Sequence, residues 1–277
     1  MKKQSKLLRR FFILLFLMII TIVIFLLSNI GSINAPPTPT SGMSDVIQNG
    51  LDYLEVQINP ELGLLREAPI AAPNKYWLTN DNSLAAYTFD QFGRTEPRDI
   101  IIQSINQYDS HENNFIEVVM GHVVDMPPRI PEAVLITKIG DADIWTEKHE
   151  SDSRYEDWQE YANLGFMMVL NSVNQDNVNL AQEQVLTTMQ MFDGKGFRDK
   201  AYNESYETYK LALAIYAASK CKVELQDGEK ILEILLKMQD KNGGFHTHYD
   251  ENLNPMGDTN TETTSFALLA LKFLVYQ

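Results

Sequence analysis

Cysteine is nearly absent from this sequence, since Cys221 is the only one and no internal disulfide can stabilise the fold. The residues around it favour a helix, in which we expect a buried, inert thiol; a nucleophilic role is the remote alternative. No cysteine directly follows the apolar N-terminal run, which argues against a bacterial lipoprotein. Stability must therefore come from core packing, and 277 residues with 44% apolar content can bury one good core.

Positive charge is scarce beyond the N-terminus. Five of the 23 Lys and Arg precede residue 11, which leaves 18 against 37 Asp and Glu and a net charge of −19 on the rest of the chain. Such a surface repels phosphate backbones, so we expect no nucleic-acid partner. Cations, neutral glycans and basic proteins remain open as partners, and the charge can also serve solubility alone.

Familiar catalytic signatures are lacking as well. The sequence has no convincing Ser/His/Asp or Cys/His triad, no helical H-E-x-x-H motif and no phosphate-binding glycine loop. The stretch Gly194-Lys-Gly196 is interpreted as a helix stop, because it follows an apolar helical pattern.

The N-terminus contains the longest apolar run. Five cations precede 17 uncharged residues over 11–27, a length at the lower edge of a membrane span. With the next few residues counted as interfacial, we expect residues 11–33 to contact the lipid bilayer, with the N-terminus cytoplasmic and the remainder outside. A cleaved signal peptide ending at Ala35 is the alternative, but Ile33 is large for such a site.

Three segments follow from this pattern. Residues 1–34 are predicted to form a signal anchor or transmembrane helix, and residues 35–44 a Pro/Thr-rich linker. Residues 45–277 are predicted to form one folded domain, with a β-rich excursion at about residues 113–145.

A helical hairpin is the repeating unit of the predicted domain. Its clearest copy is Leu235–Leu271, which contains a helix end, a glycine stop, a polar loop and a second helix start. Its second helix starts near an acidic residue, Glu262. Two looser copies of the unit have Asp81 and Glu207 at comparable helix starts. Repeats of this length predict stacked helical hairpins.

The glycine stops resemble a known repeat. Gln239–Phe245 fits the Q-x-x-x-G-x-[WF] core of the QW repeats of squalene and terpenoid cyclases, and Gln190–Gly194 with Phe197 is a looser match. Those enzymes share an α/α toroid with protein prenyltransferase β subunits, so the resemblance implies such a fold over residues 45–95 and 155–277. The D-x-D-D and D-D-x-x-D motifs and the Asp, Cys and His zinc set are missing. The predicted fold class is all-α, with a small β excursion and one preceding transmembrane helix. Because about four hairpins are fewer than a closed ring needs, the predicted toroid is incomplete.

Two readings of the three recurring acids stay open. Asp81, Glu207 and Glu262 can converge on one mouth of the scaffold as catalytic acid and base, as carboxylates do in glycan hydrolysis. Alternatively, each carboxylate stabilises its own helix terminus by roughly 0.3–1 kcal/mol. Their recurrence at equivalent positions favours the structural reading.

Residues that do not recur are the other candidates for a ligand site. His246 and His248 lie two residues apart on an extended segment, so their side chains share a side. With Asp258 or Glu262 they can hold a divalent metal; the alternative is that they are solvated loop residues. Loop aromatics can form a platform for sugar rings or an apolar ligand, or can simply pack the loops onto the helix ends. The predicted ligand-binding residues are Tyr76, Trp77, Tyr206, His246, His248, Tyr249 and Asp258.

Three functions fit these observations. The first is binding of a surface ligand such as a glycan by a membrane-anchored domain, and the second is a glycoside hydrolase or lyase that uses the mouth carboxylates. The third is a structural or protein-interaction module of a surface complex. Exposed aromatics beside one mouth favour binding, whereas neighbouring carboxylates in a cleft, one of them with a raised pKa, favour hydrolysis.

Overall fold

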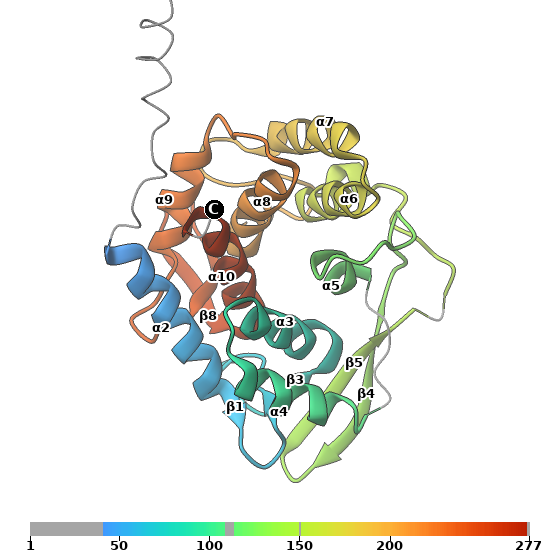
Figure 1. Ribbon diagram of the computed structural model, residues 1–277, viewed down its shortest axis with the longest axis vertical. Coiled ribbons are helices and arrows are strands. Elements are labelled where there is room, and N and C mark those ends of the chain that lie inside the picture. Colours follow the sequence, from blue (N-terminus) through green and yellow to red (C-terminus); the bar gives the residue numbers. More distant parts are fainter. Residues whose placement is uncertain (1–40, 109–113, 150, 276–277) are drawn as a thin grey trace, which may run out of the picture. The chain divides into compact units, whose positions relative to one another are not determined.

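Two layers of helices make up most of the protein. The computed structural model describes residues 41–108, 114–149 and 151–275. Figure 1 shows α10, α8 and α6 side by side, with α2, α9 and α7 on their outer side. A further inner helix, α3, packs against α10 and is covered by α4, while the short α5 packs against α6. The inner helices are α3 (Ser83–Gln91), α6 (Ala162–Asn174), α8 (Thr208–Cys221) and α10 (Thr261–Val275); the others are α2 (Ser41–Gln57), α4 (Thr95–Ile105), α5 (Asn114–Val119), α7 (Val178–Thr188) and α9 (Gly228–Lys237).

Residue composition explains which helices lie inside. Helix α8 is buried on nearly all sides, and its alanines let neighbouring helices approach closely. Helix α9 instead alternates Ile231, Ile234 and Leu235 with charged residues, so it buries one stripe and exposes the other face to solvent. The single cysteine, Cys221, is buried at the end of α8, and burial raises the pKa of its thiol.

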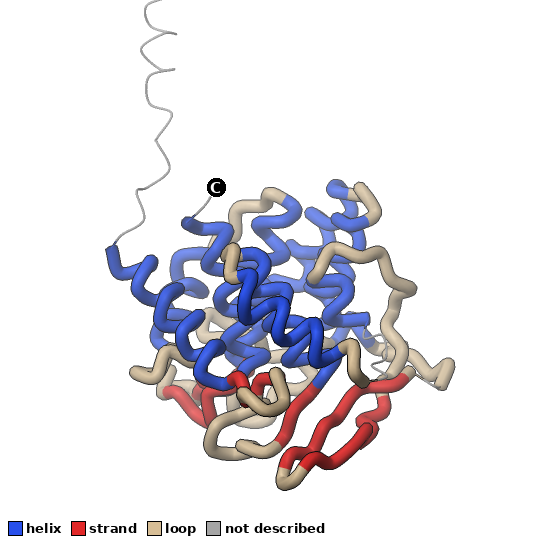
Figure 2. The backbone as a smooth tube through the Cα atoms, turned by 60° about the horizontal axis from the view of Figure 1, so that its bottom comes forward, coloured by secondary structure: helices blue, strands red, loops and turns tan. Residues whose placement is uncertain are grey.

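Three small sheets lie at one end of the helices (Figure 2). One pairs β1 (Ile58–Asn59) with β2 (Leu64–Leu65). In the second, β5 (Ala142–Lys148) lies between β3 (Lys75–Trp77), which runs parallel to it, and β4 (Glu132–Ile139), which is antiparallel. The third sheet is antiparallel and contains β6 (Tyr206–Glu207), β7 (Phe245–Tyr249) and β8 (Pro255–Asn260).

The predicted all-α class is wrong. The protein is 51% helical and 19% strand, with three sheets among the described residues, and is therefore mixed. The connections between outer and inner helices were expected to be polar loops, but their backbone groups pair with one another as strands. Within the predicted β excursion, residues 114–119 form α5, whereas the strands β4 and β5 extend to Lys148.

The prediction of a single-pass membrane protein is also corrected. Within residues 41–108, 114–149 and 151–275, no helix is long and apolar enough to cross a membrane. The longest of these helices, α2, has 17 residues and contains three carboxylates. The span predicted at residues 11–33 lies outside the described residues, and α2 begins at Ser41, inside the segment predicted as a linker.

The glycine stop of the clearest repeat connects two helices. The Gln239 side chain donates hydrogen bonds to Val46 O (2.8 Å) on α2 and to Gly243 O (2.9 Å). Gly243 has a φ of +92°, and a Cβ atom there would lie 2.1 Å from Asn49 O, also on α2. The loop after α9 is thus fixed against α2 by both its glutamine and its glycine.

Replacing Gly243 with alanine is expected to destabilise the protein by at least about 2 kcal/mol, because the left-handed backbone and the clash with a carbonyl group add up. Gly93→Ala is the matched control, since its φ is +68° but nothing lies within 4 Å of the added Cβ. Urea unfolding of both variants measures the difference. Equal losses in the two variants would show that the contact with α2 contributes nothing.

Candidate functional site

A cavity of about 310 Å³ opens where the inner helices begin. Its wall is built from the first turns of α8 and α10, from α5 and α6, and from β5. Three carboxylates reach it from three different elements, and its other lining residues include amide, aromatic and aliphatic side chains. The lining residues are Asn80, Phe115, Ile116, Pro131, Glu147, Tyr155, Asn163, Met167, Glu207, Tyr209, Glu262 and Phe266.

Glu262 occupies the first turn of α10. The start of this helix is fixed by the Asn260 side chain, which accepts a hydrogen bond from Thr263 N (2.8 Å), and by Thr261, whose N–H donates to Glu67 O (3.0 Å). Burial raises the pKa of Glu262 to about 7, with further contributions from the charges of Glu147, Glu67 and Glu207. A helix N-terminus alone would favour the charged carboxylate, so desolvation and repulsion outweigh the helix dipole here.

Glu207 is the residue immediately before α8, and it has a cationic partner. Lys210 Nζ lies 2.5 Å from Glu207 Oε2 and 2.7 Å from Asp199 Oδ2. The side chains of Lys210 and Asp199 are 2% and 0% exposed, so this is a buried ion pair. Asp199 Oδ2 also accepts a hydrogen bond from Ala162 N (2.8 Å) at the start of α6. One buried network therefore fixes the beginnings of α6 and α8, and it holds Glu207 at the cavity wall.

Asp81 lies close to the cavity but is not exposed in it. It belongs to a π-helical turn, Leu78–Asn82, that precedes α3, and only 3% of its surface is accessible. Its Oδ2 atom has no hydrogen-bond partner among the described residues. Burial, followed by the charges of Glu262, Glu67 and Glu147, raises the pKa of Asp81 well above its usual value. A buried carboxyl oxygen without a hydrogen-bond partner costs stability, and π-helical turns are frequent at functional sites.

Two further carboxylates of the cluster, Glu147 and Glu67, are not among the sequence-predicted site residues. Glu147 projects from β5, and its Oε1 atom accepts a hydrogen bond from Asn80 Nδ2 (3.2 Å). Glu67 accepts one from the Trp77 indole (3.1 Å) and lies 3.8 Å from Lys75 Nζ. Glu67 comes from the connecting loop of the first predicted hairpin, and Glu147 from a segment outside the predicted repeats. Recognising β5 as a strand is the one signal that would have drawn attention to Glu147.

Aromatic rings complete the cavity wall. The rings of Tyr209 and Phe266 lie 5.9 Å apart, and those of Phe115 and Tyr155 lie 6.5 Å apart. Burial raises the pKa of both tyrosines, so their hydroxyl groups remain protonated at neutral pH. Aromatic side chains beside convergent polar groups occur in small-molecule sites, and the volume of about 310 Å³ is at the lower end of their range of roughly 300–1,000 Å³.

The predicted aromatic platform is arranged differently. Tyr206 and Tyr249 are buried and stack on each other with 5.3 Å between ring centres. Tyr76 is buried too, and its hydroxyl accepts a hydrogen bond from Asn59 (2.9 Å). These three rings pack the strands onto the helix ends and leave no exposed face for a ligand. Trp77 is partly exposed and lies against Trp145 with 5.8 Å between ring centres.

The predicted histidine site is not part of the cavity wall. His246 Nδ1 lies 3.0 Å from Gly257 O, and His248 Nδ1 lies 2.9 Å from Thr247 Oγ1. Asp258 Oδ2 accepts hydrogen bonds from the backbone of Ile70 (2.7 Å) and Ala71 (2.8 Å), so it holds a loop. In the described ranges, no group of three or more His, Cys, Asp or Glu is placed to hold a metal ion.

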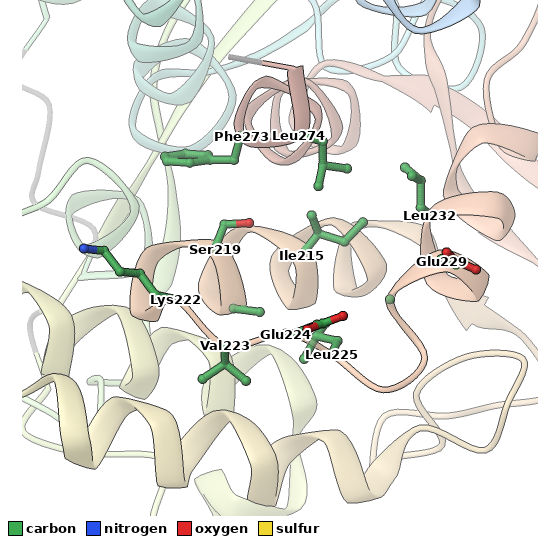
Figure 3. A pocket seen from close by; sticks show the side chains of 12 residues that line it. Ile215, Ser219, Lys222, Val223, Glu224, Leu225, Glu229, Leu232, Phe273 and Leu274 are labelled. Atoms are coloured by element: carbon green, nitrogen blue, oxygen red, sulfur yellow. The ribbon is translucent and has the colours of Figure 1, made fainter. Parts of the chain in front are cut away.

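A larger groove lies at the opposite ends of α8 and α10, and Figure 3 shows its side chains. Its volume is about 760 Å³, and residues of α8, α9 and α10 line it. Ile215, Leu232 and Phe273 make much of it apolar, and its two carboxylates, Glu224 and Glu229, belong to the surface around α9. The groove therefore offers no acid and base pair comparable to the carboxylates of the smaller cavity.

Comparison of the chain with protein-family models, with curated proteins and with solved structures finds no match. The resemblance to QW repeats consequently rests on the Gln239–Phe245 motif and stays a prediction. By its fold and its site, this is a mainly helical protein with a partly aromatic cavity in which carboxylates converge.

Proposed function

We propose that this protein is a glycoside hydrolase in which Glu262 is the general acid and Glu207 the base or nucleophile. The observation that supports this most directly is the convergence of three carboxylates on one cavity, one of them with a pKa of about 7. Glycosidases use a pair of carboxyl groups in which one is protonated and the other is charged.

The two residues divide the reaction between them. Protonated Glu262 donates its proton to the glycosidic oxygen as the bond from that oxygen to the anomeric carbon breaks. The Glu207 carboxylate accepts a proton from the water whose oxygen bonds to the anomeric carbon. In the alternative route it bonds to that carbon itself, and a water then displaces it while Glu262 takes the proton of the water. The Lys210 ammonium lies 2.5 Å from the partly exposed Glu207 carboxylate and is its counter-ion.

Glycan binding without chemistry is supported less well. The loop aromatics predicted to form its platform, Tyr76, Tyr206 and Tyr249, are buried and offer no exposed face. A raised pKa at Glu262 also has no use in a site that only binds, and like charges in one cavity reduce stability.

The test is hydrolysis of a panel of 4-nitrophenyl glycosides and of unsubstituted polysaccharides by the purified protein. We expect release of nitrophenol or reducing ends from at least one substrate, and loss of about 100-fold or more in both Glu262→Gln and Glu207→Gln. Glu233→Gln is the control, because Glu233 is exposed on α9 and forms an ion pair with Lys237. Hydrolysis that survives both cavity substitutions would exclude the proposed roles.

The pH profile gives an independent check. Activity requires a protonated Glu262, so kcat/KM is expected to fall as pH rises through about 7. The charge of Glu147 helps to raise this pKa, and Glu147→Gln should therefore move the basic limb to lower pH. An unmoved limb in this variant would show that another group controls the upper pH range.

A further inference from the structure

We infer that the substrate is a neutral, β-1,4-linked chain of hexopyranose units, one of which stacks on the rings of Trp77 and Trp145 beside the cavity. This inference rests on the proposed hydrolase function. It adds to that function a second binding position and a class of substrate, because a single sugar cannot occupy the cavity and these rings together.

The two indole rings lie together on one face of the second sheet. The parallel pairing of β3 with β5 places Trp77 beside Trp145, with 5.8 Å between the ring centres. Their strand neighbours Tyr76 and Ile144 are buried on the other face, and because side chains alternate along a strand, the indoles face outward and are partly exposed. Leu135 of β4 is the pairing partner of Trp145 and is 36% exposed. The three side chains form an apolar row across the sheet.

This row adjoins the cavity through two separate contacts. Trp145 and Glu147 are two residues apart in β5, so they share a face and lie about 7 Å apart along the strand. Glu147 lines the cavity. Trp77 Nε1 donates a hydrogen bond to Glu67 (3.1 Å), whose charge contributes to the raised pKa of Glu262. The rings and the catalytic carboxyl group are therefore within reach of one oligosaccharide.

The indole of Trp145 is costly for the fold. Its Nε1 atom is buried and has no hydrogen-bond partner within the described ranges. A buried N–H group without a partner reduces stability, and a phenylalanine at this position would avoid that cost. A large flat ring placed at such a cost, on the outward face of a strand that also lines the cavity, points to a role in binding.

The surroundings of the rings suit a sugar. The C–H groups on one face of a β-linked hexopyranose form a flat apolar surface that can lie on an aromatic ring. Lys75 Nζ lies 5.8 Å from the centre of the Trp145 ring and 3.8 Å from Glu67, and both charged side chains are partly exposed, so they can bind sugar hydroxyl groups. The net charge of −19 beyond residue 10 repels acidic glycans, so a neutral chain fits better.

The experiment measures how binding depends on chain length. Titration calorimetry with Glu262→Gln, which cannot donate a proton, compares β-1,4-linked dimers and tetramers of glucose and of N-acetylglucosamine. We expect at least one tetramer to bind about 10-fold more tightly than its dimer. Adding Trp145→Leu should remove this advantage and leave the dimer unchanged, whereas Trp145→Phe should keep most of it. Tyr202→Leu is the control, because this partly exposed ring stacks on Tyr206 and does not line the cavity.

The outcomes separate the two proposals. Tetramers that bind no more tightly than dimers, or equally well after Trp145→Leu, would overturn the second binding position, and cleavage that depends on Glu262 would leave the hydrolase intact. Tetramer binding that requires Trp145, without cleavage by the unmodified protein, would overturn the hydrolase and leave the binding position. If Trp145→Leu does not fold, Trp77→Leu replaces it. Failure of all four sugars to bind folded Glu262→Gln would overturn the inference.

Discussion

Glu262→Gln is expected to stabilise the protein above neutral pH while it removes hydrolysis. In the unfolded chain the glutamate ionises near its usual pKa of 4.5, but in the folded protein it ionises only near pH 7. The folded state therefore holds the proton more tightly, and stability falls as pH rises from about 4.5 to about 7 and is level beyond that. Glutamine cannot ionise, so the variant escapes this loss.

The gain should reach about 2 kcal/mol at pH 8 and vanish near pH 4, since a pKa difference of one unit corresponds to about 1.4 kcal/mol and partial exposure reduces the full effect. Urea unfolding at several pH values measures it, with Glu233→Gln as the exposed control. Hydrolysis by Glu262→Gln should fall by about 10²–10⁴-fold, the usual contribution of a general acid. A variant that is less stable than the unmodified protein at pH 8 would show that Glu262 is a structural carboxylate.

Lys210→Met is expected to be the most destabilising single change near the cavity, with a loss of about 3–5 kcal/mol. It leaves Asp199 buried without its counter-ion, although the backbone N–H groups of Ala162 and Ala201 still donate to that carboxylate. It also removes the partner of Glu207, so any hydrolysis by the folded fraction should fall as well.

Two comparisons isolate the buried charge in this prediction. Lys237→Met breaks an exposed ion pair with Glu233 and should change stability by less than about 1 kcal/mol. The double variant Lys210→Met with Asp199→Asn should recover part of the loss, because it removes the orphaned charge. A loss of less than 1 kcal/mol from Lys210→Met alone would show that water reaches Asp199 and that the network does not hold the helix starts.

Repetition made part of the site predictable. Asp81, Glu207 and Glu262 precede or begin inner helices in the sequence pattern, and the structure brings all three to the same end of the helices. Each carboxylate was expected to be stabilised by its helix terminus. Their mutual repulsion could not be read from spacing along the chain, because it depends on Glu67 from a connecting loop and on Glu147 from β5.

Contacts between segments distant in the sequence also explain why the predicted aromatic platform is wrong for Tyr206 and Tyr249. Tyr206 and Tyr249 look like exposed loop aromatics in sequence, but they face each other across the pairing of β6 with β7 and are buried by it. Pairing between segments more than 40 residues apart leaves no local periodic signal strong enough to reveal it. The predicted fold class is wrong for this reason, since the sequence pattern places β6 at a helix start and β7 and β8 in a polar connection between helices.

The central claim is that the cavity keeps the Glu262 carboxyl protonated beside the carboxylates that raise its pKa. A carbon-13 NMR titration of this carboxyl group tests that claim most directly. The resonance is identified by its loss in Glu262→Gln. We expect a midpoint near pH 7 in the unmodified protein and a lower midpoint in Glu147→Gln. A midpoint near 4.5 that does not respond to Glu147 would contradict the account, because Glu262 would then be ionised at neutral pH and unable to donate a proton.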